Sequence, residues 1–225
     1  MVWYGLNLDI RTARCVLQTR RYEQLNMLYP TFLTRPATHV DAHHIVQLLS
    51  VLYSETEYLP HAPGDVIASP QQLAVRIEAG NRTGGAPVFV AEVKGELVGV
   101  VFGSRGMTAR TRHIMHVVIG VLQAHCGLGI GHALMRDLET SAAMHHLHRL
   151  ELAVHSDNQR AIALYKHLGY VIEGKKLQSV CIRDKYVDEL ILSKLLNITE
   201  TAVSVSERTH AAITQMRASR QKKTA

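Results

Sequence analysis

The sequence of 225 residues contains few cysteines and no long apolar run, and each shortage excludes a class of protein. Its three cysteines, Cys15, Cys126 and Cys181, are far apart and cannot all pair, so we expect a reducing compartment rather than a disulfide framework. Apolar stretches such as 117–122 are far shorter than the ~18 residues of a membrane span. The first residues lack the basic start, apolar block and cleavage site of a signal peptide. We therefore predict a cytoplasmic protein with no membrane contact.

Aromatic residues are also scarce, at 5% of the chain, and this bears on the net charge of +6. Eight of the 25 lysines and arginines lie near the two ends, and no basic run is interleaved with aromatic residues. This pattern is typical of a solvated surface and argues against nucleic-acid binding. The 14 histidines lack Cys or Glu partners at zinc spacing, so we expect no metal site. The basic balance does suit a small polyanionic ligand.

Composition divides the chain into three parts. Residues 1–30 are rich in arginine and poorly patterned, and we interpret them as an N-terminal extension. Residues 31–196 carry regular apolar periodicity and form the expected domain. Residues 197–225 are polar with a basic end, and we interpret them as a C-terminal tail.

Helical and strand patterns alternate within the expected domain. Helices are predicted to open at Thr38, with its Thr-x-x-Asp capping pattern, and to span 69–80, 128 to about 146, and 158–168. Gly169 follows the last of these in a position that favours glycine. Strands are predicted at 32–35, 87–93, 97–104, 113–121, 149–155, 170–172 and 188–192. This order predicts an α/β fold around a mixed sheet.

The strongest chemical signal is the segment VLQAHCGLGIGHAL at 121–134. A predicted strand runs into a glycine-rich turn that opens an amphipathic helix, and such a turn exposes backbone N–H groups at a positive helix end. It therefore predicts a phosphate or pyrophosphate site, although a tight turn with glycines for packing would give the same pattern. A Walker A loop needs Gly-Lys-Ser/Thr, which is lacking. A dinucleotide-binding loop needs GxGxxG and a later acidic residue, and neither is present.

A second segment follows at 155–174, HSDNQRAIALYKHLGYVIEG. Together the two segments resemble the GNAT superfamily of acyl-CoA-dependent N-acetyltransferases, whose motifs are Arg/Gln-x-x-Gly-x-Gly/Ala and then N-x-x-A-x-x-L-Y-x-x-x-G-F/Y. The resemblance covers about residues 31–196. Within the superfamily, the spacing of the motifs and the ending at 173–189 are similar to the bacterial ribosomal-protein branch and to branches that acylate small amines or amino acids.

The resemblance implies a GNAT fold, a mixed central β-sheet flanked by helices on both faces, with acetyl-CoA as cofactor. The backbone of Ile119 and Val121 would bind the pantetheine arm. The side chain of Asn158, also well suited to a helix start, would contact the cofactor. The pyrophosphate would lie on the amides of the turn, Gly127, Leu128, Gly129, Ile130, Gly131 and His132.

One position departs from the family pattern. Cys126 stands where Arg or Gln is usual, so a side-chain donor to the cofactor is lost. Either Cys126 is a small filler and binding is weaker, or His125, His132 or Arg136 compensates.

The chemistry of acetyl transfer to an amine defines the catalytic candidates. An alkylammonium of pKa ~10.4 is only about 0.1% neutral at pH 7.4, so a base is needed, and the departing thiolate gains from an acid. Tyr165 resembles the family tyrosine that faces the sulfur, and a core aromatic is the alternative. For the base we propose His116 and Glu57, with Glu55 and Glu151 as further candidates; a core histidine and solvated carboxylates are the alternatives.

We therefore predict an N-acetyltransferase that moves an acetyl group directly from acetyl-CoA to a primary amine in a ternary complex. A small molecule or amino acid is the expected acceptor. The alternatives are a protein N-terminal or lysine acetyltransferase and a catalytically weak acyl-CoA-binding regulatory module. Because dimers are common in the family, the resemblance is also compatible with a homodimer.

Overall fold

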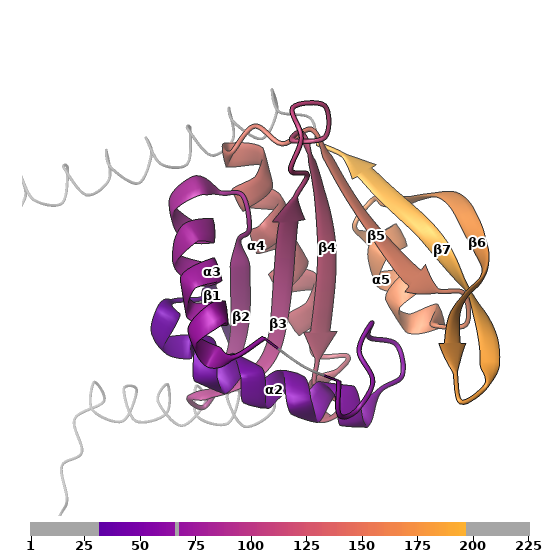
Figure 1. Ribbon diagram of the computed structural model, residues 1–225, viewed down its shortest axis with the longest axis horizontal. Helices are drawn as coiled ribbons and strands as arrows, with labels where there is room; N and C mark the ends of the chain where they lie inside the picture. Colours follow the sequence, from indigo (N-terminus) through magenta and orange to yellow (C-terminus); the bar gives the residue numbers. More distant parts are fainter. Residues whose placement is uncertain (1–31, 66–67, 197–225) are drawn as a thin grey trace, which may run out of the picture.

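The computed structural model describes residues 32–65 and 68–196, so the predicted extensions at 1–30 and 197–225 lie outside the described residues. One seven-stranded sheet runs through it in the order β1-β2-β3-β4-β5-β7-β6 (Figure 1). Among these strands, β4 and β5 form the only parallel pair. The strand bounds are β1 Phe32–Pro36, β2 Val88–Val93, β3 Glu96–Arg105, β4 Ile114–Val121, β5 Arg149–His155, β6 Val171–Ile182 and β7 Lys185–Leu195.

Helices cover both faces of the sheet, as predicted. Helices α2 (Ala42–Glu55) and α3 (Pro70–Thr83) pack on one face and share a core with β2 and β3. Helices α4 (Ile130–Met144) and α5 (Gln159–His167) pack on the other face over a larger core (Figure 1). Short 3-10 helices, η1 (His39–Asp41) and η2 (Gln123–His125), precede α2 and follow β4. In the part of the chain that the structure describes, no helix is long and apolar enough to cross a membrane.

The central feature of the sheet is a fork between β4 and β5. The two strands pair only from Ile114 to His116, opposite 149–151. Strand β4 then continues to Val121, paired with β3 alone, while β5 runs on against β7 (Figure 1). Backbone N–H and C=O groups along the free edge of β4 therefore have no strand partner. Such groups need a partner when they are buried, so the fork prepares a binding surface for an extended ligand.

Helix boundaries follow the local signals in the sequence. Ser69 caps α3: its hydroxyl accepts a hydrogen bond from the Gln72 amide at 3.2 Å, and the Gln72 side chain accepts one from the Ser69 amide at 2.9 Å. Pro70 occupies the first turn of α3. At the end of α5, Gly169 has φ +87°, which confirms the predicted stop.

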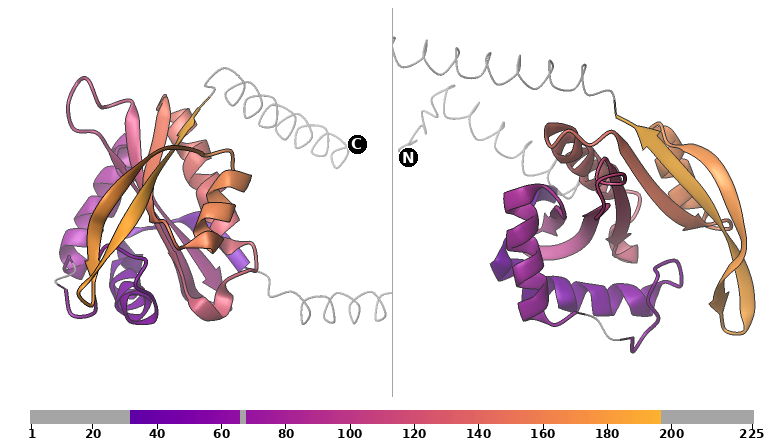
Figure 2. Two further views of the ribbon diagram at one scale, coloured as in Figure 1. Left: turned by 90° about the vertical axis from the view of Figure 1, so that its right-hand side faces the viewer. Right: turned by 45° about the horizontal axis from the view of Figure 1, so that its top comes forward.

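The last two strands are much longer than predicted. Instead of three and five residues, β6 spans twelve and β7 eleven, and the hairpin projects from the sheet (Figure 2). Strand β6 is an exposed edge strand, so the segment EGKKLQS at 173–179 has no apolar alternation that a sequence pattern could reveal. Backbone pairing with β7 and cross-strand ion pairs hold it instead, among them Lys175 with Asp188 at 2.6 Å.

A partly buried ionic cluster fixes the start of the first helical segment. Asp41 accepts two hydrogen bonds from the Arg35 guanidinium, both at 2.8 Å, and one from the Thr38 amide at 2.7 Å. Arg35 also pairs with Glu92 at 3.2 Å. The predicted Thr38–Asp41 capping pattern is confirmed, and Asp41 joins β1 to the helix as well. The hydrogen bonds from Arg35 hold the pKa of Asp41 well below its ordinary value, against the opposing effect of burial.

We expect Asp41→Asn to lower the free energy of unfolding by about 2 kcal/mol at pH 7, because a charged hydrogen-bonded group is lost. The folded pKa of Asp41 lies below its unfolded value of ~3.9, so this stability is present above about pH 4 and is lost as the pH falls below it. Urea unfolding between pH 2.5 and 7 measures the effect. The control Asp184→Asn, in the exposed β6–β7 turn, should change neither the free energy of unfolding at pH 7 nor its dependence on pH. Equal acid sensitivity in wild type and Asp41→Asn would contradict this account.

Candidate active site

A cleft of about 1180 Å³ occupies the fork between β4 and β5. One part is lined by the free edge of β4, the glycine turn and the start of α5. The other part is lined by the loop after α2, the outer half of β5, and β6 and β7. Among the predicted site residues, the cleft lining includes His116, Ile119, Val121, Gly127, Gly129, Gly131, His132, Asn158 and Tyr165.

The glycine turn supplies free backbone donors to one end of the cleft. Gly127 and Gly129 have φ of +80° and +85°, which residues with a Cβ rarely adopt. Gly129 caps α4 without a side-chain hydrogen bond, and the amides of residues 130–132 have no intrahelical partner, whereas the next amide donates to the Gly129 carbonyl. A Cβ built on Gly127 would meet no atom within 4 Å, so open space lies in front of the turn. This turn fits an anionic phosphate group.

Cys126 points back toward the strand that precedes it. Its Sγ lies 3.5 Å from the carbonyl oxygen of Leu122 and 3.7 Å from that of Val121. The thiol therefore closes the turn as a weak donor to the backbone. Of the three residues expected to compensate for it, His125 and His132 line the cleft, and Arg136 is not among the lining residues.

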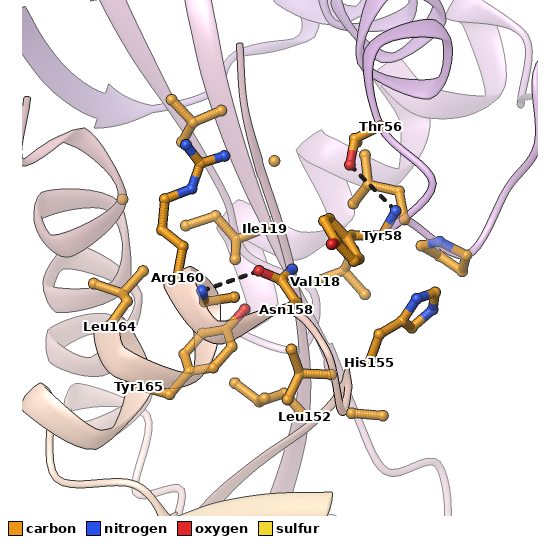
Figure 3. Close-up of a pocket in the computed structure, with 18 of the residues that line it drawn as sticks. Thr56, Tyr58, Val118, Ile119, Leu152, His155, Asn158, Arg160, Leu164 and Tyr165 are labelled. Carbon is orange, nitrogen blue, oxygen red and sulfur yellow. Dashed lines mark hydrogen bonds between the residues drawn. The ribbon is translucent and has the colours of Figure 1, made fainter. Parts of the chain in front are cut away.

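Arg160 is a cleft residue that sequence reasoning missed. It lies in the first turn of α5, and its side chain extends along the cleft beside Ile119 (Figure 3). The available signal was its position two residues after Asn158, inside the second motif. A guanidinium here provides the positive charge that Cys126 cannot.

Asn158 and Tyr165 face the cleft from α5 (Figure 3). The Asn158 side-chain oxygen accepts a hydrogen bond from the Ala161 amide at 3.1 Å, so Asn158 caps the helix. Its amide nitrogen stays available to a ligand. Tyr165 is only 7% exposed, and burial raises its pKa far above the ordinary value. The hydroxyl is therefore protonated at neutral pH, the form that a proton donor requires.

His116 and Glu151 form a pair at the point where the fork opens. The Nδ1 atom of His116 lies 3.0 Å from Oε1 of Glu151, in the last residue pair that joins β4 to β5. When it is neutral, an imidazole in this position can donate Nδ1–H to the carboxylate, and its lone pair is then on Nε2. The His116 side chain is 61% exposed, so it is not a core histidine. This arrangement can accept a proton from a bound amine.

The other carboxylate candidates have different surroundings. Glu57 lies outside the cleft lining and forms an ion pair with Arg183 in the β6–β7 turn, at 2.6 Å. That ion pair joins the loop after α2 to the tip of the hairpin. Glu55 lines the cleft, but its Oε2 accepts a hydrogen bond from the Gln123 amide at 2.9 Å and so holds η2. The geometry therefore favours the His116–Glu151 pair over Glu57 as the base.

Two further residues missed by sequence reasoning form an aromatic wall on the side of the cleft beside the loop after α2. The rings of Tyr58 and His155 meet edge to face, with centroids 5.6 Å apart (Figure 3). His155 ends β5 and is 5% exposed. Alternation along β5 puts its side chain on the same face as Glu151, and this was the signal available in the sequence. The wall gives the cleft an aromatic surface four residues along β5 from Glu151.

The forked sheet, the glycine turn before α4 and the helix α5 capped by Asn158 together define an acyl-CoA-dependent N-acyltransferase. The model of the Acetyltransferase (GNAT) family matches residues 49–170, more than half of the chain. The protein belongs to this family, and the prediction from its two motifs is confirmed.

Individual relatives agree with this assignment. The chain is 29% identical over 145 residues to the L-amino acid N-acetyltransferase AaaT of Escherichia coli (strain K12), a match that covers 64% of this chain and 84% of that protein. A GNAT-family acetyltransferase from Streptococcus pneumoniae superposes with a TM-score of 0.71 at 24% identity, covering 74% and 100% of the two chains.

Two other solved structures are similar. The ribosomal-protein-alanine N-acetyltransferase of Brucella melitensis has a TM-score of 0.65 at 25% identity, with 73% and 99% of the chains covered. The putative acetyltransferase yncA of Salmonella typhimurium, solved with acetyl-CoA, has a TM-score of 0.67 at 21% identity, with 74% and 94% covered.

We expect Gly127→Ala to weaken acetyl-CoA binding at least tenfold, ~1.4 kcal/mol, because a Cβ would enter the space in front of the turn and re-aim its amides. Gly95→Ala is a matched control: Gly95 has φ +87°, also with no atom within 4 Å of a Cβ, but lies in the β2–β3 turn away from the cleft. Both variants should lose about 1–2 kcal/mol of stability. Calorimetric titration measures the affinity of each variant for acetyl-CoA. Equal affinities in the two variants would show that the glycine turn does not bind acetyl-CoA.

Proposed function

We propose that this protein transfers the acetyl group of acetyl-CoA directly to the primary amine of a small molecule, with amino acids as the leading acceptor class. One observation carries the proposal: His116 and Tyr165, which lie on opposite faces of the sheet, line the same cleft at the fork. Met115 and Val117 pack in the core that α4 and α5 cover, called the α4 core. His116 lies between them in β4, so its side chain points to the face that α2 and α3 cover. Tyr165 belongs to the α4 core itself.

The donor half of the cleft holds coenzyme A. The amides of residues 127–132 bind the pyrophosphate, helped by the positive end of α4. The free edge of β4 at Ile119 and Val121 pairs with the pantetheine arm as a strand would. Asn158 contributes its side-chain nitrogen, and Arg160 adds a positive charge beside the polyanion.

The acceptor enters beside His116. Nε2 of the imidazole removes one proton from the ammonium group, and Glu151 stabilises the resulting imidazolium. The neutral nitrogen then attacks the thioester carbonyl, and a backbone N–H of β4 stabilises the oxyanion. As the carbon–sulfur bond breaks, the Tyr165 hydroxyl gives its proton to the thiolate, and a proton released from the acetylated nitrogen restores the tyrosine. The products are an N-acetyl amide, free coenzyme A and one proton, which passes from His116 to solvent.

The preference for an amino acid rests on the relative and on the cleft lining. The relative from Escherichia coli is an L-amino acid N-acetyltransferase. On the acceptor side, the aromatic wall of Tyr58 and His155 suits an apolar side chain. Lys176 lines the same region, 3.8 Å from Glu189, and offers a positive charge to an α-carboxylate.

A protein N-terminus is the second acceptor to consider, because the similar structure from Brucella melitensis is a ribosomal-protein-alanine acetyltransferase. The ion pair between Glu57 and Arg183 favours the small acceptor, since it joins the two elements that border the acceptor side. A homodimer remains a prediction, and sedimentation velocity measures it.

The acceptor class is tested by release of coenzyme A with the twenty L-amino acids, their decarboxylated amines and N-terminal peptides as alternative acceptors. We expect turnover with apolar or aromatic L-amino acids. Their kcat/KM should exceed that of the matching amines about tenfold, because the amines lack the carboxylate. Lys176→Gln should remove this difference. Faster turnover of peptides than of every free amino acid would overturn the small-acceptor proposal.

The acid is tested by Tyr165→Phe, for which we expect kcat to fall about 100-fold while the Kd of acetyl-CoA changes less than twofold. Tyr170→Phe is the matched control, because Tyr170 is also buried, with its ring 5.9 Å from that of Tyr165, but is absent from the cleft lining. Stopped-flow turnover and calorimetry give the two values. Unchanged turnover in Tyr165→Phe would contradict the acid role.

A further inference from the structure

Glu151 is part of a hydrogen-bonded chain that crosses four strands. Beyond its contact with His116, its second carboxylate oxygen accepts a hydrogen bond from Arg149 Nε at 3.0 Å. The two terminal nitrogens of Arg149 donate to the two carboxylate oxygens of Glu173 on β6, with Nη1 2.8 Å from Oε1. Ser193 on β7 donates to Glu173 at 2.6 Å. The chain thus runs from His116 on β4 through β5 and β7 to β6.

Glu173 reaches Arg149 because of an irregularity in β6. Ile172 pairs with Leu192, but Gly174, two residues on, pairs with the adjacent Ile191. Glu173 is therefore the extra residue of a β-bulge, a feature that redirects a side chain. Here the bulge directs a carboxylate across β7 toward β5. The hydrogen bonds from Arg149 lower the pKa of Glu173 to about 2, so it is ionised at neutral pH.

We propose that Arg149 and Glu173 are positioning residues that hold Glu151 as the partner of a catalytic His116. The inference rests on the proposed function, because it takes His116 as the base. Arg149 occupies one oxygen of Glu151 and leaves the other to accept Nδ1–H of His116. Glu173 fixes the guanidinium through two parallel hydrogen bonds, an arrangement that lysine cannot reproduce.

The charges give Arg149 a second role. An unneutralised carboxylate 3.0 Å from His116 would favour the imidazolium, which cannot accept a proton. The positive charge of Arg149, whose Nε donates to the same carboxylate, opposes that effect. On the other side of His116, its β3 neighbour Ser104 accepts a hydrogen bond from Arg76 of α3 at 2.8 Å, so a second cation faces the same region.

The test combines the pH profile of kcat/KM with histidine tautomers from long-range ¹H–¹⁵N spectra, in which His116 is assigned by its loss in His116→Gln. In the wild type we expect the Nδ1–H tautomer. Arg149→Met should move the acid limb of the profile and the His116 titration up by about one pH unit. Glu173→Gln should move both slightly down, lower kcat about fivefold and mix the tautomers. Arg149→Lys should keep the midpoint but mix the tautomers.

Asp188→Asn is the matched control, because it removes a carboxylate that pairs with Lys175 in the same hairpin without touching Arg149. It should leave the tautomer and the pH profile unchanged. If Arg149→Met does not fold, Arg149→Lys and Glu173→Gln carry the test.

The outcomes separate this inference from the proposed function. A wild type that acetylates no amine would refute the function, and the tautomer spectra would still decide the positioning role. Full activity in His116→Gln would overturn both the base and the inference. Loss of kcat in Arg149→Met and Glu173→Gln with an unmoved pH limb and an unchanged tautomer would show a purely structural role and overturn the inference alone.

Discussion

Strands β4 and β5 stay hydrogen-bonded over three residue pairs and then separate, and the site depends on this separation. A parallel pair that continued would satisfy the backbone of both strands and leave no room between them. Because the ladder stops, one edge of β4 keeps N–H and C=O groups that have no strand partner and face the cleft. The glycine turn, the start of α5 and the aromatic wall of Tyr58 and His155 all lie around this opening. The cleft thus lies where β4 and β5 no longer form hydrogen bonds with each other.

The two faces of the sheet give the acid and the base different surroundings. Tyr165 lies in an apolar core that raises its pKa and keeps the phenol protonated at neutral pH. His116 lies on the other face with its side chain exposed, next to charged side chains that orient its ring. Tyr165 therefore lies in a low-dielectric environment, and His116 lies in one that is exposed to solvent. Strand β4 contacts both environments because successive side chains along it point to opposite faces of the sheet.

More of the cleft residues near the glycine turn and α5 were predicted from the sequence than of those near the loop after α2 and the hairpin. Glycines 127, 129 and 131 and Asn158 follow a local pattern, since turn conformation and helix capping depend on neighbouring residues. The acceptor half is assembled from β4, β5, β6 and the loop after α2, which are distant in sequence. Glu57 illustrates the limit: its position in the loop was right, but only tertiary structure shows Arg183 beside it. The hairpin strands were underestimated because β6 is exposed on both faces and lacks apolar alternation.

The bulge at Glu173 has a consequence for the solubility of the protein. Strand β6 is a twelve-residue edge, and such an edge invites pairing with a strand of another molecule. Register shifts at 172–174 and 176–180 interrupt its ladder, so a straight incoming strand finds only short matching stretches of donors and acceptors. Lys175 and Lys176 add charge between the two interruptions. The irregularity that delivers a carboxylate to Arg149 thereby also protects the open end of the sheet against aggregation.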